Sequence, residues 1–177
     1  MAGQPIKELP LFSIEDVKFV YRTNFAGEER PPFDEAGDRY FNAAIPSDEV
    51  AQQMAADGWN VKWTKPGKAA ADEVVAEFVP EPYIVVALGF KFRAPQIILI
   101  RDGRPSVITE KNVALLDSTE FETVDVVVRA RHWEGPQGSG YKAWLAEFYG
   151  TVNLSDMGKK YAHLLDIPSS SDDNADD

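Results

Sequence analysis

VDVVVRARHWEGPQGSGYKAWLAEFYGTVNL, residues 124–154, is the stretch that decides the fold. Its first part, 124–133, and its last part, 141–154, are rich in β-branched and aromatic residues, which favour strands. The intervening EGPQGSG contains three glycines and one proline, a composition typical of a flexible hairpin tip. The sequence therefore predicts two long antiparallel strands joined by a loop.

Shorter strand patterns precede this hairpin. Alternating apolar and aromatic residues predict strands at 17–25, 39–45, 59–63, 83–92 and 96–100, with a brief strand in GRPSVIT. Glycine, proline and charge predict loops at 26–38 and 64–80. Ser47 suits the N-cap of a short helix that Gly58 ends, and Thr109 suits the cap of a second helix in EKNVALLD.

These patterns give six or seven strands and two short helices, with no alternation of strand and helix that would predict a parallel sheet. We therefore expect a mostly β protein, an OB-fold-like antiparallel barrel with extra strands. The chain has 177 residues, which suits one domain. We expect that domain to span residues 1–167.

The chain ends in SSSDDNADD, and nothing apolar follows Ile167. Such a segment cannot bury enough surface to offset the entropy of ordering it. We therefore expect a disordered acidic tail over residues 168–177. Its acidic side chains are Asp172, Asp173, Asp176 and Asp177.

Bulk composition excludes several classes of protein. The formal net charge is −11, which argues against general binding to duplex DNA or to membranes, because both depend on many lysine and arginine contacts. No apolar run approaches the roughly 20 residues of a membrane span, and the start of the chain lacks the pattern of a secretory signal. There is no cysteine, so disulfides and sulfur-ligated metals are excluded. We expect a cytoplasmic protein.

The sequence offers no clear set of catalytic residues. The two histidines, His132 and His163, are isolated, and no serine or acid accompanies them in a recognisable pattern. Carboxylates gather at 28–38, but glycine and proline interrupt that loop, which makes it a poor clamp for Mg²⁺. We therefore expect no enzymatic activity, no cofactor and no metal.

Cations and aromatic side chains recur on shared faces of the predicted strands, because side chains alternate faces along a strand. In 124–133, Arg129, Arg131 and Trp133 fall on one face. In 83–93, Lys91 and Arg93 share a face, while Phe90 and Phe92 are expected in the core. The candidate DNA-binding residues are Lys18, Arg22, Lys62, Trp63, Lys91, Arg93, Arg129, Arg131, Trp133 and Tyr141.

This combination matches the chemistry of single-stranded nucleic acid. Lysine and arginine meet phosphates, and exposed bases stack on aromatic rings for about 1–3 kcal/mol each. Every base has a π-face, so such binding is largely independent of the nucleotide sequence. The alternative interpretation is that the cations form a solvated face and the aromatic residues the edge of the core.

The chain also resembles the single-stranded-DNA-binding proteins of tailed bacteriophages. The stretches that carry the resemblance span about residues 20–152 and are YRTNFAGEERPPFDEAGDRYFNAAI, MAADGWNVKW, EPYIVVALGFKF, APQIILI, TEKNVALLD and YKAWLAEFYGTV. The resemblance implies an OB-fold and a non-enzymatic coat for exposed DNA during phage replication, recombination and repair, in the host cytoplasm. It also implies that the acidic tail recruits replication or recombination proteins and competes with DNA for the basic groove.

Other functions stay open at this point. Exposed aromatic residues on a sheet also suit a protein–protein adaptor or a structural phage component, and the interpretation leaves room for a homodimer. A barrel that stacks sugars or small molecules, and a metal nuclease using the carboxylates of 28–38, are further alternatives.

Overall fold

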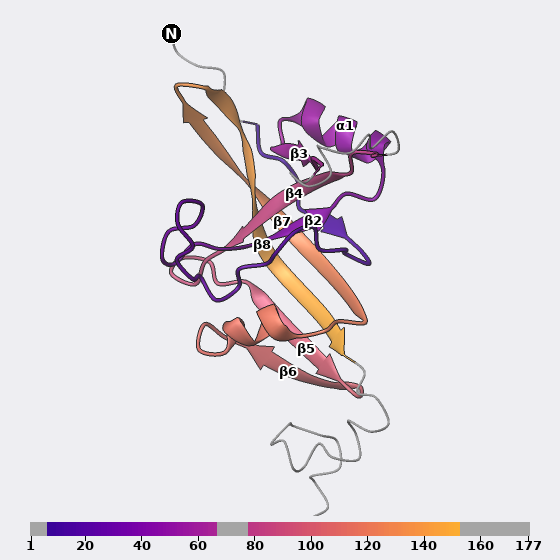
Figure 1. Cartoon of the computed structure of the whole chain (residues 1–177), viewed down its shortest axis with the longest axis vertical. Helices are drawn as coiled ribbons and strands as arrows, with labels where there is room; N and C mark the ends of the chain where they lie inside the picture. Colours follow the sequence, from indigo (N-terminus) through magenta and orange to yellow (C-terminus); the bar gives the residue numbers. More distant parts are fainter. Residues whose placement is uncertain (1–6, 67–77, 153–177) are drawn as a thin grey trace, which may run out of the picture.

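The computed structural model describes residues 7–66 and 78–152, and eight strands form one sheet within them (Figure 1). The strands are β1 (Phe12–Ile14), β2 (Arg39–Ala44), β3 (Val61–Trp63), β4 (Pro82–Leu88), β5 (Gln96–Arg101), β6 (Arg104–Ile108), β7 (Thr123–Gly135) and β8 (Gly138–Val152). An α-helix, α1 (Asp48–Asp57), and a 3₁₀-helix, η1 (Val113–Ser118), accompany them. The predicted mostly β fold with two short helices is confirmed.

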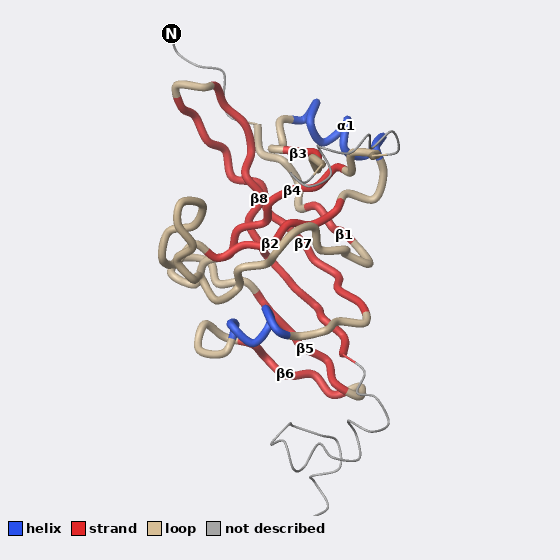
Figure 2. Tube along the Cα trace, in the orientation of Figure 1, coloured by secondary structure: helices blue, strands red, loops and turns tan. Residues whose placement is uncertain are grey.

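Strand β8 organises the sheet. The main path runs β1-β7-β8-β4-β2, with β3 added beside β4 and the β5–β6 hairpin added beside β8. Most pairs are antiparallel, but β8 runs parallel to both β4 and β5. The sheet is therefore mixed, where the sequence led us to expect an antiparallel one. Figure 2 shows the β7–β8 hairpin reaching past the rest of the sheet at one end, with β5 and β6 at the other.

Segment 17–25, predicted as a strand, runs beside β2 without forming a regular ladder. It makes isolated bridges from Phe19 to Ala43 and from Asn24 to Tyr40. Tyr21 has a φ of +59°, which interrupts the extended backbone that a strand requires. Together with β1, which pairs with β7, this segment brings the two ends of the sheet together. The resulting ring, with β4 parallel to β8, has the strand arrangement of an OB-fold.

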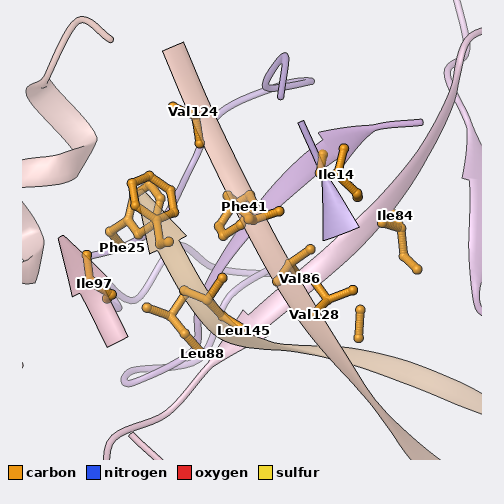
Figure 3. Close-up of a cluster of buried hydrophobic side chains, with 14 of the residues drawn as sticks. Ile14, Phe25, Phe41, Ile84, Val86, Leu88, Ile97, Val124, Val128 and Leu145 are labelled. Carbon is orange, nitrogen blue, oxygen red and sulfur yellow. The ribbon is translucent and has the colours of Figure 1, made fainter. Parts of the chain in front are cut away.

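Hydrophobic side chains fill the interior of this ring, and Phe25 and Phe41 are among them (Figure 3). Phe25 stacks on Phe41 at a centroid distance of 5.4 Å, and both meet Phe148 edge to face at 5.8 and 5.9 Å. All three are fully buried. Offset-stacked and edge-to-face pairs are the favoured geometries for aromatic rings, so this cluster fixes how the strands cross.

Strand alternation separates the core face of the sheet from its outer face. On β4, Ile84, Val86 and Leu88 are buried in the core, which leaves Tyr83 and Val85 pointing outward. The pairing of β7 with β8 shifts between Val127 and Val128, a bulge at which β8 has one extra residue. The outer face of β4, β8 and β7 carries Arg129, Arg131 and Trp144 of the site described below.

Helix α1 follows its prediction closely. The hydroxyl of Ser47 accepts a hydrogen bond from the backbone N–H of Val50 at 3.2 Å, and Gly58 adopts a φ of +102° at the C-cap. The second helix is a 3₁₀-helix whose N-cap is Asn112, so the predicted Thr109 cap is wrong. The backbone N–H of Thr109 instead donates to the side chain of Asn112 at 2.7 Å.

Two further predictions need correction. Strand β4 ends at Leu88 rather than continuing to residue 92, and Phe92, predicted in the core, is 95% exposed. The expected flexible tip EGPQGSG is mostly strand, because β7 continues to Gly135 and β8 begins at Gly138. The predicted acidic tail 168–177 and most of the predicted loop 64–80 lie outside the described residues.

Candidate functional site

An open groove of about 770 Å³ is lined by residues of β7 and β8, by the end of β4 and by the loops beside it. One wall is formed by residues 36–39, which run into the start of β2, and by residues 88–93, which run from the end of β4 into the next loop. The other is formed by Arg129–Arg131 and Trp144. Four of the predicted residues therefore come together in one groove, although they lie in two separate parts of the sequence. They are Lys91, Arg93, Arg129 and Arg131.

Trp144 on β8 stands at the centre of this surface. Strand register places it beside Arg129 on β7 and beside Ala87 on β4. The guanidinium of Arg131 lies 5.7 Å from the centroid of its ring, and the ammonium of Lys142 lies 5.2 Å away. Both distances are in the range of cation–π attraction, so Trp144 and two cations form a single unit.

Gly89, the first residue after β4, lies against the Trp144 ring. A Cβ atom at Gly89 would lie 3.3 Å from the Trp144 ring, which is tighter than ordinary van der Waals contact. Glycine therefore allows the indole to lie close to the chain as it leaves β4. The indole Nε1 is buried and has no hydrogen-bond partner among the described residues.

The sequence contained a signal for Trp144 that our prediction did not use. Lys142 and Trp144 are two residues apart on a strand and so share a face, as Arg129 and Arg131 do. We selected Tyr141 because it starts the returning strand. The structure places Tyr141 on the opposite face, where its ring contacts His132 at 5.2 Å and its hydroxyl donates to the backbone carbonyl of Lys7.

Two phenylalanines complete the groove. Phe90 is half-buried against the core, and the guanidinium of Arg39 lies 5.7 Å from its centroid. Phe92 lines the groove and is almost wholly solvent-exposed. An apolar ring in that position contributes little to folding and is available to a ligand.

The groove is basic although the chain is acidic. Five cations line it, namely Arg39, Lys91, Arg93, Arg129 and Arg131, against two carboxylates, Asp38 and Glu110. One carboxylate is engaged, since Arg39 pairs with Glu110 at 3.8 Å. Within the described part of the chain, the other four cations have no carboxylate at ion-pair distance. Their charge is thus available to an anion.

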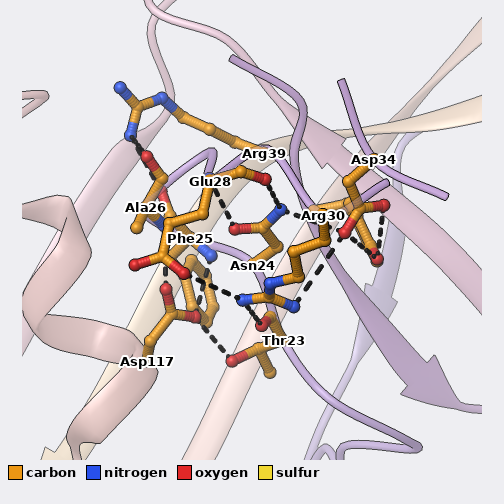
Figure 4. Close-up of polar contacts among 10 residues, drawn as sticks. Thr23, Asn24, Phe25, Ala26, Glu28, Arg30, Asp34, Arg39 and Asp117 are labelled. Atoms are coloured by element: carbon orange, nitrogen blue, oxygen red, sulfur yellow. Dashed lines mark hydrogen bonds and ion pairs between the residues drawn. The ribbon is translucent and has the colours of Figure 1, made fainter. Parts of the chain in front are cut away.

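A polar network anchors the loop that forms one wall of the groove (Figure 4). The carboxylate of Asp117 accepts hydrogen bonds from the hydroxyl of Thr23 at 2.7 Å and from the backbone N–H groups of Phe25 and Ala26 at 2.8 and 2.9 Å. Arg39 donates to the carbonyls of Phe25 and Ala26 at 2.8 and 3.2 Å. These bonds tie the start of the loop to η1 and to β2.

The same loop is held further along by a buried carboxylate. Asp34 accepts hydrogen bonds from the hydroxyl of Tyr40 at 2.9 and 3.1 Å and from the side-chain amide of Asn24 at 3.3 Å. Burial raises the pKa of Tyr40, and its hydrogen bond to Asp34 raises that pKa further. Tyr40 therefore remains a neutral hydrogen-bond donor beyond the ordinary range of a phenol.

A smaller cavity of about 290 Å³ adjoins the groove across Trp144. The two share residues 37–39, Leu88 and Trp144. The smaller cavity is further lined by Phe33, Asp34, Tyr40, Val85, Ala87 and Lys142. Phe33 is 88% exposed, so each of the two loops beside Trp144 carries a solvent-exposed phenylalanine.

The remaining predicted residues lie outside the groove. Lys18 is exposed and pairs with Glu81 at 3.7 Å, and Arg22 is exposed on segment 17–25. Trp133 shares a strand face with Arg129 and Arg131, but its indole N–H donates to the side chain of Asn60 at 3.2 Å.

The side chains of Lys62 and Trp63 lie on opposite faces of the sheet, because the two residues are neighbours on β3. Lys62 pairs with Tyr83 on the outer face, and Trp63 pairs with Pro82 and points to the other side. Trp63 is 39% exposed. The tail residues Asp172, Asp173, Asp176 and Asp177 lie outside the described residues.

Residues 7–66 and 78–152 lack two other kinds of feature. No group of three histidine, aspartate or glutamate side chains there could hold a metal ion. No helix in the same ranges is long and apolar enough to cross a membrane.

The family model described as "Putative phage ssDNA-binding domain" matches residues 1–176. A search of curated protein sequences found no match.

Several solved structures are similar to this chain. The single-stranded DNA-binding protein from bacteriophage Enc34, in complex with ssDNA, is 13% identical with a TM-score of 0.46, and the match covers 79% of this chain and 85% of that one. A C-terminal truncation of the same protein is 12% identical with a TM-score of 0.47, covering 84% and 97%. The bacteriophage T7 protein gp2.5 is 11% identical with a TM-score of 0.38, covering 92% and 96%.

Proposed function

The chain belongs to the family of phage single-stranded-DNA-binding domains, and we propose that the DNA strand lies in the groove beside Trp144. One observation supports this location above the others. Four cations from two distant parts of the sequence line a groove that also contains Phe90, Phe92 and Trp144. Phosphates and bases would each meet a suitable partner there.

In this proposal the phosphates contact Lys91, Arg93, Arg129 and Arg131, and bases stack on Phe92 and Trp144. Stacking needs the faces of unpaired bases, which a duplex hides between neighbouring base pairs. The remaining acidic surface would repel a duplex that extended beyond the groove. The groove therefore favours single strands.

We extend the proposal to the role of the protein in the cell. It coats exposed single-stranded DNA during phage replication, recombination and repair in the host cytoplasm, without catalytic activity. The acidic residues Asp172, Asp173, Asp176 and Asp177 recruit partner proteins and compete with DNA for the cations of the groove. Such competition is electrostatic, so salt weakens it.

The location of the binding site is tested by tryptophan fluorescence. The titrant is a thymidine oligomer of about 16 nucleotides, the upper end of the site size of one OB-fold. We expect quenching as bases stack on Trp144. The variant Arg93→Ala/Arg131→Ala removes one exposed cation from each wall, and we expect it to bind at least tenfold more weakly.

The matched control is Lys7→Ala/Lys111→Ala, which removes two exposed cations that do not line the groove. It should bind as the wild type does, and a duplex should quench neither protein. Equal weakening in both double variants would place the site elsewhere. A flat titration of the wild type at low salt would favour a protein–protein adaptor instead.

The proposed role of the tail is tested separately. Deletion of 168–177 should tighten binding of the oligomer at low ionic strength and have a smaller effect at about 0.15 M salt, where the Debye length is about 8 Å. Equal affinities of the full chain and the truncated chain at low salt would contradict competition by the tail.

A further inference from the structure

A second group of aromatic and basic residues lies at the far end of the outer face of β4. We call Tyr21, Tyr83 and Lys62 the distal station. The rings of Tyr21 and Tyr83 meet edge to face at a centroid distance of 5.6 Å. Lys62 is exposed and stands opposite Tyr83 in the register of β3 and β4. Aromatic rings next to a cation are what a further nucleotide would need.

Tyr21 adopts a backbone conformation that costs energy for a residue other than glycine. Tyr21 is 57% exposed, and its φ of +59° is uncommon for a residue other than glycine. The backbone N–H of Lys65 donates to its hydroxyl at 3.1 Å, and the ring contact with Tyr83 also holds it in place. An exposed tyrosine held in a strained conformation indicates a functional role more than a contribution to the core.

A continuous surface joins the distal station to the groove. Tyr83, Val85 and Ala87 alternate along the outer face of β4, and Ala87 pairs with Trp144. The cavity of about 290 Å³ occupies this interval, and Lys142 and Tyr40 are among its lining residues. By strand rise, Tyr83 and Ala87 are about 13 Å apart, a separation that a few nucleotides can cover.

We propose that the distal station is a second binding site for the same DNA strand. The strand enters at the groove, crosses Trp144 and the adjoining cavity, and places a further base against Tyr21 and Tyr83 with its phosphate near Lys62. This inference rests on the proposed function of the groove. It adds that the full binding site is longer than the groove alone.

The test compares two lengths of thymidine oligomer, about 6 and about 16 nucleotides, within the range of site sizes for one OB-fold. The variant Tyr21→Asn/Lys62→Ala removes the exposed ring and the charge, and asparagine tolerates a positive φ. We expect the longer oligomer to bind about tenfold more weakly to this variant than to the wild type. We expect the shorter oligomer, which the groove accommodates, to bind both proteins equally.

Tyr21→Phe/Lys62→Arg is the matched control, because it keeps a ring and a charge at both positions. It should restore the affinity for the longer oligomer. The inference is overturned if the longer oligomer binds the first variant as tightly as the wild type, or if both lengths weaken equally. If the wild type binds neither oligomer, or Arg93→Ala/Arg131→Ala leaves the shorter one unaffected, the proposed function fails independently of the distal station.

Discussion

Trp144 is held by strand pairing and by its neighbouring cations, and its indole N–H makes no hydrogen bond with the described residues. Its position follows from register, with Arg129 on one side and Ala87 on the other. Arg131 and Lys142 lie within 6 Å of the ring, and Arg131 is also one of the four cations proposed to contact phosphate. One residue therefore links the stacking and the electrostatic parts of the proposed interface.

Phe92 allows base stacking on a single side chain to be tested with little effect on the fold. It is 95% exposed, so Phe92→Ala removes little packing and should leave the thermal unfolding midpoint unchanged. Loss of one stacked base costs about 1–3 kcal/mol, which corresponds to roughly 5- to 150-fold weaker binding of a thymidine oligomer. Titration of the variant checks this, with Phe92→Tyr as the control that keeps the ring. Unchanged affinity in Phe92→Ala would remove Phe92 from the interface.

Tyr40 supports a prediction about pH. Its pKa is raised above the ordinary value of 10.0 by burial and by the hydrogen bond to Asp34. Because the pKa is raised in the folded state, the neutral Tyr40 hydroxyl stabilises the fold. This contribution to the free energy of unfolding is complete below about pH 10 and is lost as pH rises through the folded pKa. Tyr40→Phe removes a hydrogen bond to a carboxylate, so we expect it to lower the free energy of unfolding by about 1.5–3 kcal/mol at neutral pH.

Denaturant unfolding of wild type and Tyr40→Phe at a series of pH values checks this prediction. The difference in the free energy of unfolding should be constant up to about pH 10 and shrink above it. A difference that grows with alkaline pH would contradict the assigned hydrogen bond.

Alternation along a strand was sufficient to predict part of the site. Arg129 and Arg131 were found because 124–133 is regular, so every second side chain does lie on one face. Phe92 was misplaced because the alternation was extended past the end of β4 at Leu88. Trp144 could be assigned to a face from sequence, but its place beside Ala87 depends on tertiary pairing.

At the scale of elements, the loop before β2 is held by η1. Asp117 accepts three hydrogen bonds from residues 23–26, which lie about 90 positions earlier in the chain. The loop then continues to residues 36–39, which line the groove. The 3₁₀-helix therefore contributes to the proposed interface without touching it.

Asp117→Asn should disturb both stability and binding. The asparagine amide group would face the backbone N–H of Ala26 or of Phe25, which leaves a donor without an acceptor. We expect the free energy of unfolding to fall by about 1–3 kcal/mol, together with weaker binding of a thymidine oligomer. Denaturant unfolding and fluorescence titration measure the two effects.

Asp125→Asn is the matched control for this variant. Asp125 is exposed and accepts one hydrogen bond, from the backbone N–H of Asp16 at 2.9 Å. The control should have the smaller effect on stability and none on binding. Similar losses in the two variants would mean that the Asp117 network does not specifically support the loop.

Elements with a strong local signal were predicted well. Strand β2, helix α1 and the long pair β7 and β8 all appear close to their expected bounds. Segment 17–25 has the composition of a strand, but Tyr21 adopts a positive φ, which composition does not reveal. The parallel pairing of β8 with β4 and β5 joins distant segments, and no local pattern encodes such a contact.

The molecule as a whole is acidic, with a net charge of −11, and its groove is basic. Local charge decides the contact with a phosphate, while the overall charge acts at longer range and is screened by salt. A chain with more carboxylates than cations can therefore still bind phosphate, because its cations gather in one groove. The salt dependence of the DNA-binding constant therefore measures how many groove cations contact phosphates.

For single strands, log K falls with log salt by about 0.7 per phosphate contact, so four contacts predict a slope of about −3. Lys91→Ala/Arg93→Ala removes two exposed cations from the groove and should reduce the slope to about −1.5. Titrations at several salt concentrations check this, with Lys7→Ala/Lys111→Ala as the charge-matched control. A slope that changes equally in both double variants would indicate diffuse attraction rather than defined contacts.

Strand β8 pairs with β7 along almost its whole length, with β4 at Ala143 and Trp144, and with β5 over residues 147–152. Interior strands of a sheet expose their amides only when a neighbouring ladder opens. The main path of the sheet and the β5–β6 hairpin consequently share strand β8, so opening the pairing on one part loosens the strand that supports the other. Hydrogen exchange along β8 should therefore occur as one cooperative event, in which the pairing at Trp144 and the pairing of β8 with β5 open together.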